Sequence, residues 1–185
     1  FQMLGYRISD LYNEGFKKSD LLVFEYPSDK ELRETGVTGL FLGYYTNWNA
    51  LEHTQKMVNL AWNRNPDGPT QGSYYDFENL DCKWVGLHDY LKFLKYGFGR
   101  ATDQLCIEIR HGRISRDEAI RIVRKYEGQV PRAYLADFLK FTGSSEEEFL
   151  KTLDKFTNRK IFKTDEKNNL IRDKNGDVIK IDYGY

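Results

Sequence analysis

With 185 residues, the chain is long enough to bury one core, or one core and a small appendage. Hydrophobic residues make up 40% of it and aromatic residues 15%, which is enough apolar material for a globular fold. The 28 basic and 28 acidic residues balance, so the composition argues against a protein that mainly coats nucleic acid or a membrane surface.

The sequence shows no sign of export or membrane insertion. No apolar run approaches the roughly 18 residues that a membrane span needs, and the first residues lack a signal-peptide pattern. Cys82 and Cys106 lie outside any CxxC spacing. We therefore expect free, buried thiols in a reducing compartment, with a disulfide or metal role as the alternative, and a cytoplasmic protein.

The first third of the chain predicts alternating helices and strands. Ser28 and Glu31 have the spacing of a capping box, which predicts a helix that ends at Gly36. Residues 37–45 (VTGLFLGYY) form an apolar run between glycines, typical of a buried strand in a parallel sheet. Asn49 and Glu52 open a second helix. This rhythm of helix, strand and helix predicts an α/β fold.

The remainder of the chain predicts helices and then a hairpin. Glycine and proline in residues 63–73 indicate a loop or domain joint. Helices are expected over 87–96, from Thr102 onward, from Ser115 to Gly128, from Pro131 to Gly143, and from Ser144 through Phe156. In the tail, Asn175-Gly176 between two apolar runs predicts a β-hairpin, which explains the aspartates of residues 173–177 better than a calcium loop does.

The stretch from Gly86 to Gly112 contains the strongest candidate for a functional site. His88, Lys92 and Lys95 fall on one stripe of the predicted helix, and Gly97 and Gly99 separate it from the next. Free N–H groups at a helix N-terminus beside basic side chains suit an anion. We predict phosphate or sugar-nucleotide binding by Lys92, Lys95, Arg100 and Thr102, with His88 or Asp103 as the proton-transfer group. A solvated helix face followed by a glycine turn is the alternative.

Aromatic residues after the predicted strand form a second candidate. Tyr44 and Trp48 follow its C-terminal end, where open α/β sheets bind ligands. They are expected to stack on a base or sugar, with closure of the core as the alternative. The chain contains no Walker loop, GxGxxG, GxSxG or zinc motif, so the residues alone do not specify a reaction.

Several segments resemble the N-acetyl sugar amidotransferases of the PP-loop ATP pyrophosphatase superfamily. The most specific is the block HDYLKFLKYGFGRATDQ, residues 88–104. Supporting segments are FEYPS (24–28), GLFLGYY (39–45) with Trp48, QGS (71–73) and IEIRHGRISRDEA (107–119). The resemblance covers essentially the whole chain in order.

The resemblance implies an ATP-dependent enzyme, with Mg²⁺, that adenylates the acetamido group of a free or nucleotide-linked N-acetyl sugar. Ammonia from a partner glutaminase then gives an acetamidino sugar for lipopolysaccharide or flagellin glycans. The superfamily's SGGxDS phosphate loop has no match in these residues, so we expect the C-terminal half of such an enzyme, inactive alone.

The implied architecture is the C-terminal part of a Rossmann-like parallel sheet of the PP-loop type, followed by helices. We expect a partial nucleotide-binding α/β region over 1–72, a helical region over 73–160 and a β-hairpin tail over 161–185. Two other functions stay open: a non-catalytic scaffold that docks a glutaminase, and a tRNA-binding module, which the zero net charge disfavours.

Overall fold

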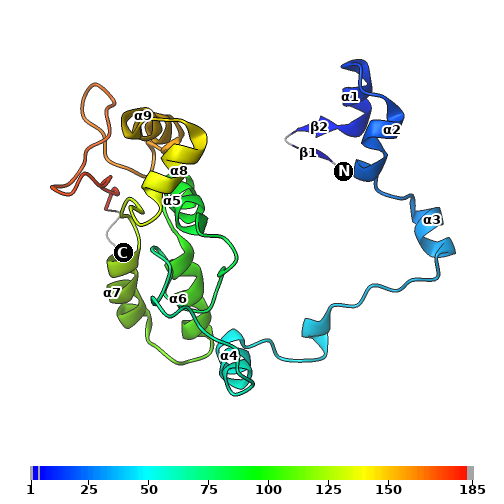
Figure 1. The fold of residues 1–185 in the computed structure, drawn as a ribbon, viewed down its shortest axis with the longest axis horizontal. Coiled ribbons are helices and arrows are strands. Elements are labelled where there is room, and N and C mark those ends of the chain that lie inside the picture. Colours follow the sequence, from blue (N-terminus) through cyan, green and yellow to red (C-terminus); the bar gives the residue numbers. More distant parts are fainter. Residues whose placement is uncertain (1, 4, 183–185) are drawn as a thin grey trace. The chain divides into compact units, whose positions relative to one another are not determined.

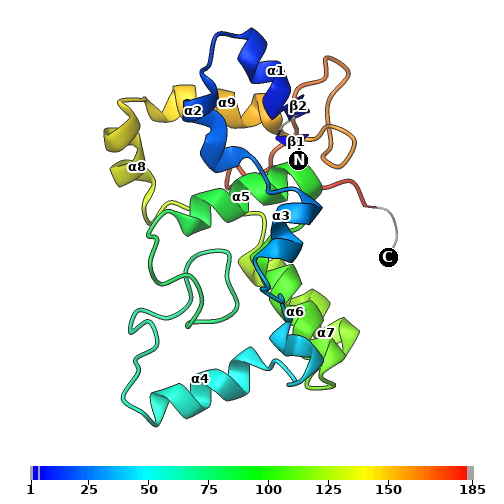
Figure 2. The same ribbon diagram turned by 90° about the vertical axis from the view of Figure 1, so that its right-hand side faces the viewer.

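The computed structural model describes residues 2–3 and 5–182 and is mostly helical (Figures 1 and 2). In this part of the chain, the strands are β1 (Gln2–Met3) and β2 (Tyr6–Arg7), which pair antiparallel. The predicted Rossmann-like parallel sheet is therefore wrong. The chain divides into two compact units, Phe1–Asn49 and Ala50–Tyr185, and each is described by itself.

The first unit contains short helices and few buried side chains. Its α-helices are α1 (Ile8–Asn13), α2 (Lys18–Leu21) and α3 (Asp29–Glu34), and 3₁₀ turns lie at Leu22–Phe24 and Leu42–Tyr44. The predicted start of α3 is confirmed. The Ser28 hydroxyl accepts a hydrogen bond from the Glu31 amide, and the Glu31 carboxylate accepts one from the Ser28 amide at 2.8 Å.

Residues 37–45 do not form the predicted buried strand. They are loop and 3₁₀ turn, and every one of them is exposed. Phe41 and Tyr44 are 77% and 85% exposed, respectively. The apolar run and its glycine boundaries were consistent with a strand, but a strand is stable only when neighbouring strands satisfy its N–H and C=O groups. Within the described residues, no strand pairs with this segment.

The second unit holds the longer helices. They are α4 (Ala50–Val58), α5 (Val85–Tyr96), α6 (Arg100–Arg110), α7 (Arg116–Tyr126), α8 (Leu135–Thr142) and α9 (Glu146–Phe156). Ser115 caps α7 as its spacing predicts. The start of α9 differs from the prediction by one position, because Ser145 with Glu148 forms the capping box in place of Ser144 with Glu147.

Helix α5 lies at the centre of the hydrophobic core. Its inward face packs against the loop before α8, against α9 and against the C-terminal tail, and the fully or nearly buried members of this cluster are Leu87, Tyr90, Phe93, Leu94, Val130, Leu135, Leu153, Phe162 and Val178. Burial raises the pKa of Tyr90 to about 12. Because each such side chain contributes roughly 1.5–3 kcal/mol on burial, this cluster fixes the position of α5.

The C-terminal tail contains turns and isolated antiparallel bridges, one of which spans the turn where the hairpin was predicted, although neither side of the turn forms a continuous strand. Arg172 pairs with Val178 across the Asn175-Gly176 turn, and Phe162 pairs with Lys180. The turn is held by the Asp173 carboxylate, which accepts the amide N–H groups of Asn175 and Asp177. These local bonds explain the aspartates of this turn without a bound ion.

Two further observations concern the described residues as a whole. Cys82 and Cys106 are free thiols, and both are exposed, which corrects the expectation that they are buried. No helix in the described part of the chain has the length and apolar character needed to cross a membrane.

Candidate functional site

The junction between α5 and α6 brings most of the predicted site residues together. Gly97 ends α5 in the left-handed conformation, with φ of 79°. A Cβ at Gly97 would lie 2.7 Å from Cγ2 of Ile161, so the turn requires glycine on both conformational and steric grounds. Gly99 precedes α6 in extended backbone and lies close to the Glu127 carboxyl group. The two glycines therefore set the angle between the helices and position Arg100 toward α5.

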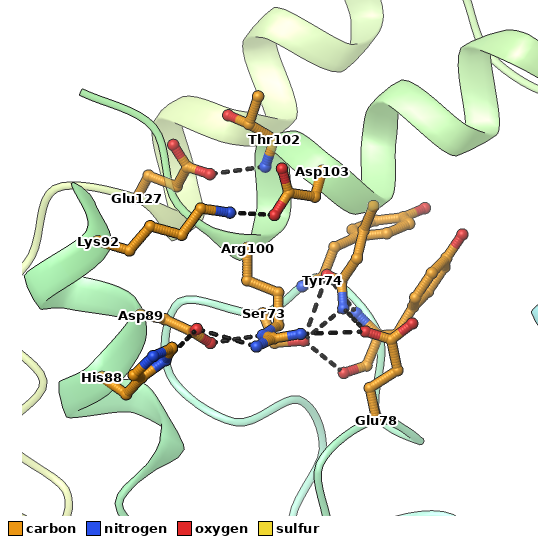
Figure 3. Close-up of polar contacts among 12 residues, drawn as sticks. Ser73, Tyr74, Glu78, His88, Asp89, Lys92, Arg100, Thr102, Asp103 and Glu127 are labelled. Carbon is orange, nitrogen blue, oxygen red and sulfur yellow. Dashed lines mark hydrogen bonds and ion pairs between the residues drawn. The ribbon is translucent and has the colours of Figure 1, made fainter. Parts of the chain in front are cut away.

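A buried ion pair joins the two helices (Figure 3). Asp89 is 5% exposed, and its carboxylate receives Nε of Arg100 at 2.5 Å and Nη2 at 3.0 Å. This two-pronged geometry matches guanidinium to carboxylate and raises the pKa of Arg100. Glu78 lies 3.8 Å from Nη1 of the same arginine. Arg100 is thus enclosed by two carboxylates.

Gln104 holds the loop that precedes α5 against α6. It is 2% exposed, and its Oε1 accepts the amide N–H of Tyr74 at 2.6 Å and that of Tyr75 at 3.3 Å. Its Nε2 donates to Ser73 Oγ at 3.0 Å and to Glu78 Oε2 at 2.7 Å. One side chain therefore satisfies four polar groups of the loop, which makes the loop a rigid wall of the site.

A second buried cluster lies one turn further along α6. Glu108 is 4% exposed, accepts two hydrogen bonds from Arg113 and accepts one from the hydroxyl of Tyr75. The Arg113 hydrogen bond is the main cause of a lowered pKa for Glu108. Burial, followed by the hydrogen bond to Glu108, raises the pKa of Tyr75. This cluster anchors the loop at a second point.

The remaining polar groups at the start of α6 are also paired. Lys92 forms an ion pair with Asp103, and its ammonium group lies 4.7 Å from the centre of the Phe98 ring. The backbone N–H of Thr102 donates to Glu127 Oε1 at 2.6 Å. Figure 3 shows both contacts beside the Asp89–Arg100 pair.

These contacts bear directly on the predicted phosphate site. The Glu127 carboxylate already binds the N-terminus of α6, and Lys92 and Arg100 are neutralised by Asp103 and Asp89. The arrangement as it stands does not fit an ATP phosphate, because an incoming anion would have to displace a carboxylate from each cation. Anion binding by these residues stays a prediction.

His88, a predicted proton-transfer residue, lies beside the buried Asp89. Its side chain is 75% exposed, and its Nδ1 lies 3.3 Å from Oδ1 of the buried Asp89. A neutral histidine that donates Nδ1–H to a carboxylate keeps Nε2 as its basic nitrogen. Asp103, the other predicted proton-transfer residue, is paired with Lys92.

The other predicted residues are Lys95, on α5, and the aromatic residues Tyr44 and Trp48. Lys95 is exposed on α5, and its ammonium group lies 5.6 Å from the centre of the Tyr96 ring. Tyr44 and Trp48 belong to the other unit, where they are 85% and 71% exposed. Their predicted stacking role stays a prediction.

The residues that the sequence analysis assigned no role are those that hold the site together: Glu78, Asp89, Gln104, Glu108 and Glu127. One signal for two of them was present in the sequence. Gln104 and Glu108 are four positions apart in a helix, so they share a face, and polar residues on the face opposite exposed charges indicate a buried network. The partners in the loop carried no such signal.

The comparison with known families decides the affiliation of the chain. The profile described as "LPS biosynthesis protein WbpG-like, C-terminal domain" matches residues 71–174, more than half of the sequence. The chain belongs to this family. The WbpG-like domain includes the whole polar network of α5, α6 and the loop before them, whereas Tyr44 and Trp48 lie outside it. The chain has no match among curated proteins.

Proposed function

We propose that this WbpG-like chain is the C-terminal part of an ATP-dependent N-acetyl sugar amidotransferase of lipopolysaccharide biosynthesis. The family affiliation establishes the lipopolysaccharide context. The amidotransferase reaction rests on the resemblance of residues 88–104, and these residues supply Asp89, Arg100 and Gln104, the centre of the polar network.

The observation that carries the proposal is the Asp89–Arg100 pair with exposed His88 beside it. Around this pair, the three carboxylates of Glu78, Asp89 and Asp103 outnumber the two cations, Lys92 and Arg100, to which they are paired. Carboxylates accept hydrogen bonds from hydroxyl and amide N–H groups, which are abundant on an N-acetyl sugar, and they repel phosphate. The site therefore suits the sugar part of a substrate better than the phosphates of ATP.

In the proposed reaction, ATP activates the acetamido oxygen as an adenylate, and ammonia then replaces AMP to leave an acetamidino group. No step at ATP is assigned to the described residues. His88 is the proposed base that removes a proton as ammonia adds, because Asp89 orients its ring and its other nitrogen stays available. A glutaminase that supplies the ammonia is the proposed partner.

A non-catalytic scaffold is the second candidate. It is favoured by the exposed apolar side chains of residues 37–45 in the first unit, of which Val37, Leu40, Phe41 and Leu42 are between 65% and 78% exposed. Exposed apolar side chains in such density commonly contact a partner protein. A scaffold predicts partner binding without any dependence on His88.

Reconstitution separates the two candidates. The chain is combined with a polypeptide that carries the SGGxDS loop, together with ATP, Mg²⁺, ammonium and a nucleotide-linked N-acetyl sugar. We expect AMP and pyrophosphate from the mixture and neither from the chain alone. His88→Gln should lower AMP formation about 100-fold, the lower end of the range for general acid–base catalysis.

His111→Gln is the matched control, because His111 is exposed at the far end of α6 and, within the described residues, makes no hydrogen bond or ion pair with His88, Asp89 or Arg100. It should leave AMP formation unchanged. AMP formation by the chain alone, or its absence from the mixture, would refute the proposed function. Equal activity of the two histidine variants would remove His88 from the mechanism and favour the scaffold.

A further inference from the structure

A large cavity opens on the other face of α6, away from the polar network. It has a volume of about 880 Å³ and lies among α6, α7 and the C-terminal tail. Thr102, Cys106 and Ile109 line it from α6, at spacings of four and three residues, whereas Gln104 and Glu108 point to the loop before α5. The cavity therefore lies on a different face of α6 from Gln104 and Glu108, although Thr102 and Glu127 contribute to both the α5–α6 junction and the cavity.

The cavity has the size and lining of a small-molecule site. Protein sites for small molecules commonly measure about 300–1,000 Å³ and are lined mainly by apolar side chains with a few polar groups. Here the apolar lining comes from α6, α7 and the tail and includes Leu105, Ile109, Ile120, Val123, Val178 and Ile181.

The charged groups at the cavity differ in whether they already have partners. The carboxylate of Glu127 accepts the Thr102 amide, and those of Asp173 and Asp177 accept amide groups of the tail and of Val130. Asp182 also has a partner. Lys180 donates to the carbonyl of Gly97 at 2.7 Å. The acids and the lysine are thus occupied by the protein itself.

Arg116 and Arg124 are the exceptions. Both line the cavity and are exposed, and within the described residues neither guanidinium group has a hydrogen bond or an ion pair. They are eight positions apart on α7, about 12 Å along the axis, so they lie on one face. Arg116 also begins α7, where the helix dipole disfavours a cation that has no anionic partner.

We infer that this cavity binds a small anionic molecule with an apolar body, whose phosphate or carboxylate groups are held by Arg116 and Arg124. Guanidinium groups bind both anions through paired N–H donors, and the apolar lining takes the body of the ligand. This inference is independent of the amidotransferase reaction, because the cavity shares no polar group of the His88–Asp89–Arg100 cluster.

The two cysteines provide the test. Cys106 lines the cavity, whereas Cys82 does not, and both are exposed. The rate at which iodoacetamide alkylates each thiol in the full chain is measured by mass spectrometry against rising n-octyl phosphate below its micellar concentration. We expect octyl phosphate to slow alkylation of Cys106 severalfold and to leave Cys82 unchanged. Inorganic phosphate lacks the apolar chain and n-octanol lacks the phosphate. Each should therefore protect Cys106 only at concentrations at least about tenfold higher.

The double variant Arg116→Gln/Arg124→Gln should need at least about tenfold more octyl phosphate for the same protection, since each charge-assisted hydrogen bond changes affinity by about that factor. The matched control is Arg110→Gln/Arg121→Gln, which removes the same amount of charge, one residue from α6 and one from α7, at positions that do not line the cavity. Circular dichroism confirms that each variant keeps its helices.

Four results would overturn the inference. They are equal protection of Cys82, no protection of Cys106, equal effects of the two double variants, and protection by octanol as effective as that by octyl phosphate. Vesicles of phosphatidic acid present the same phosphate and apolar chains on a membrane surface. Protection by vesicles but not by free octyl phosphate would replace the small molecule with a membrane surface.

Discussion

Two aromatic, glycine-containing segments of this chain differ in burial. Residues 85–105, across α5 and α6, bury Leu94 and Leu105 to 1% exposure and enclose the Asp89–Arg100 pair. Residues 37–45, which are at least as apolar, expose every side chain. The difference lies in what each segment contacts. The first packs against α9 and the tail, whereas within the described residues no strand pairs with the second, and its side chains are exposed.

The comparison shows that apolar composition does not by itself predict burial. A segment becomes part of a core when other segments of the chain cover it, and its polar groups become tolerable when they find partners there. Substitutions in both segments can therefore test whether the contacts, and not the residue types, determine stability.

The largest expected effect comes from the core. Leu94→Ala should lower the free energy of unfolding by about 4 kcal/mol, because Leu94 is 1% exposed and its removal leaves a cavity beside α9. Leu40→Ala, at a side chain that is 69% exposed, should change it by less than about 0.5 kcal/mol.

Urea denaturation followed by far-ultraviolet circular dichroism measures both values. A loss for Leu40→Ala comparable with that for Leu94→Ala would show that residues 37–45 are buried in solution, and the comparison would fail.

The next effect concerns the two ion pairs of the junction. Asp89→Ala should cost about 3 kcal/mol, because it leaves the guanidinium of Arg100 without its carboxylate in a largely buried place. Asp103→Ala breaks a pair whose side chains are 26% and 49% exposed, and it should cost less than about 1 kcal/mol. The same urea experiment measures the free energy of unfolding of both variants. Equal losses would contradict the explanation that the more buried ion pair contributes more to stability.

The smallest expected effect depends on pH. The pKa of Glu108 is lowered from its ordinary value of 4.5, so the folded state favours the ionised form. The resulting stabilisation is present above about pH 4.5 and is lost as the pH falls through the lower folded pKa. Glu108→Gln should therefore be less stable than the parent by about 1–2 kcal/mol at pH 7, with a smaller difference below pH 4.

Thermal unfolding between pH 3 and 7 measures this change. Glu166→Gln is the control, since Glu166 is exposed in the tail and, within the described residues, its carboxylate has no hydrogen bond or ion pair. A constant difference between the parent and Glu108→Gln across this pH range would contradict the role of the Arg113 hydrogen bond.

The local elements were predictable because their signals are local. Ser28, Ser115 and the glycine at 143 mark helix ends through bonds within a few residues, and the structure has helix ends at these places. The apolar run at 37–45 was misassigned because strand formation depends on distant partners, which a single segment does not reveal. The start of α9 shifted by one residue because Ser144 and Ser145 offer the same chemistry.

The site was predictable only in part. The helix that carries His88 and Lys92, and its end at Gly97, were predicted correctly because their signals lie close together in the sequence. The sequence did not predict that Lys92 pairs with Asp103, or that Arg100 pairs with Asp89. These pairs depend on the angle between α5 and α6, which the periodicity of the residues does not give. The hydrogen bond from the Thr102 amide to Glu127 joins residues 25 positions apart, so no local sequence pattern could predict it.

The end of α5 depends on residues far along the chain. The Asn158 side chain donates to the carbonyl of Lys95, and the Lys180 side chain donates to that of Gly97, across 63 and 83 positions. A ribosome adds these donors only after the helices α5 to α9 have been synthesised. During synthesis, the carbonyls of Lys95 and Gly97 therefore lack these donors until the tail is added, and a chain cut before Lys180 would leave the Gly97 carbonyl without this donor.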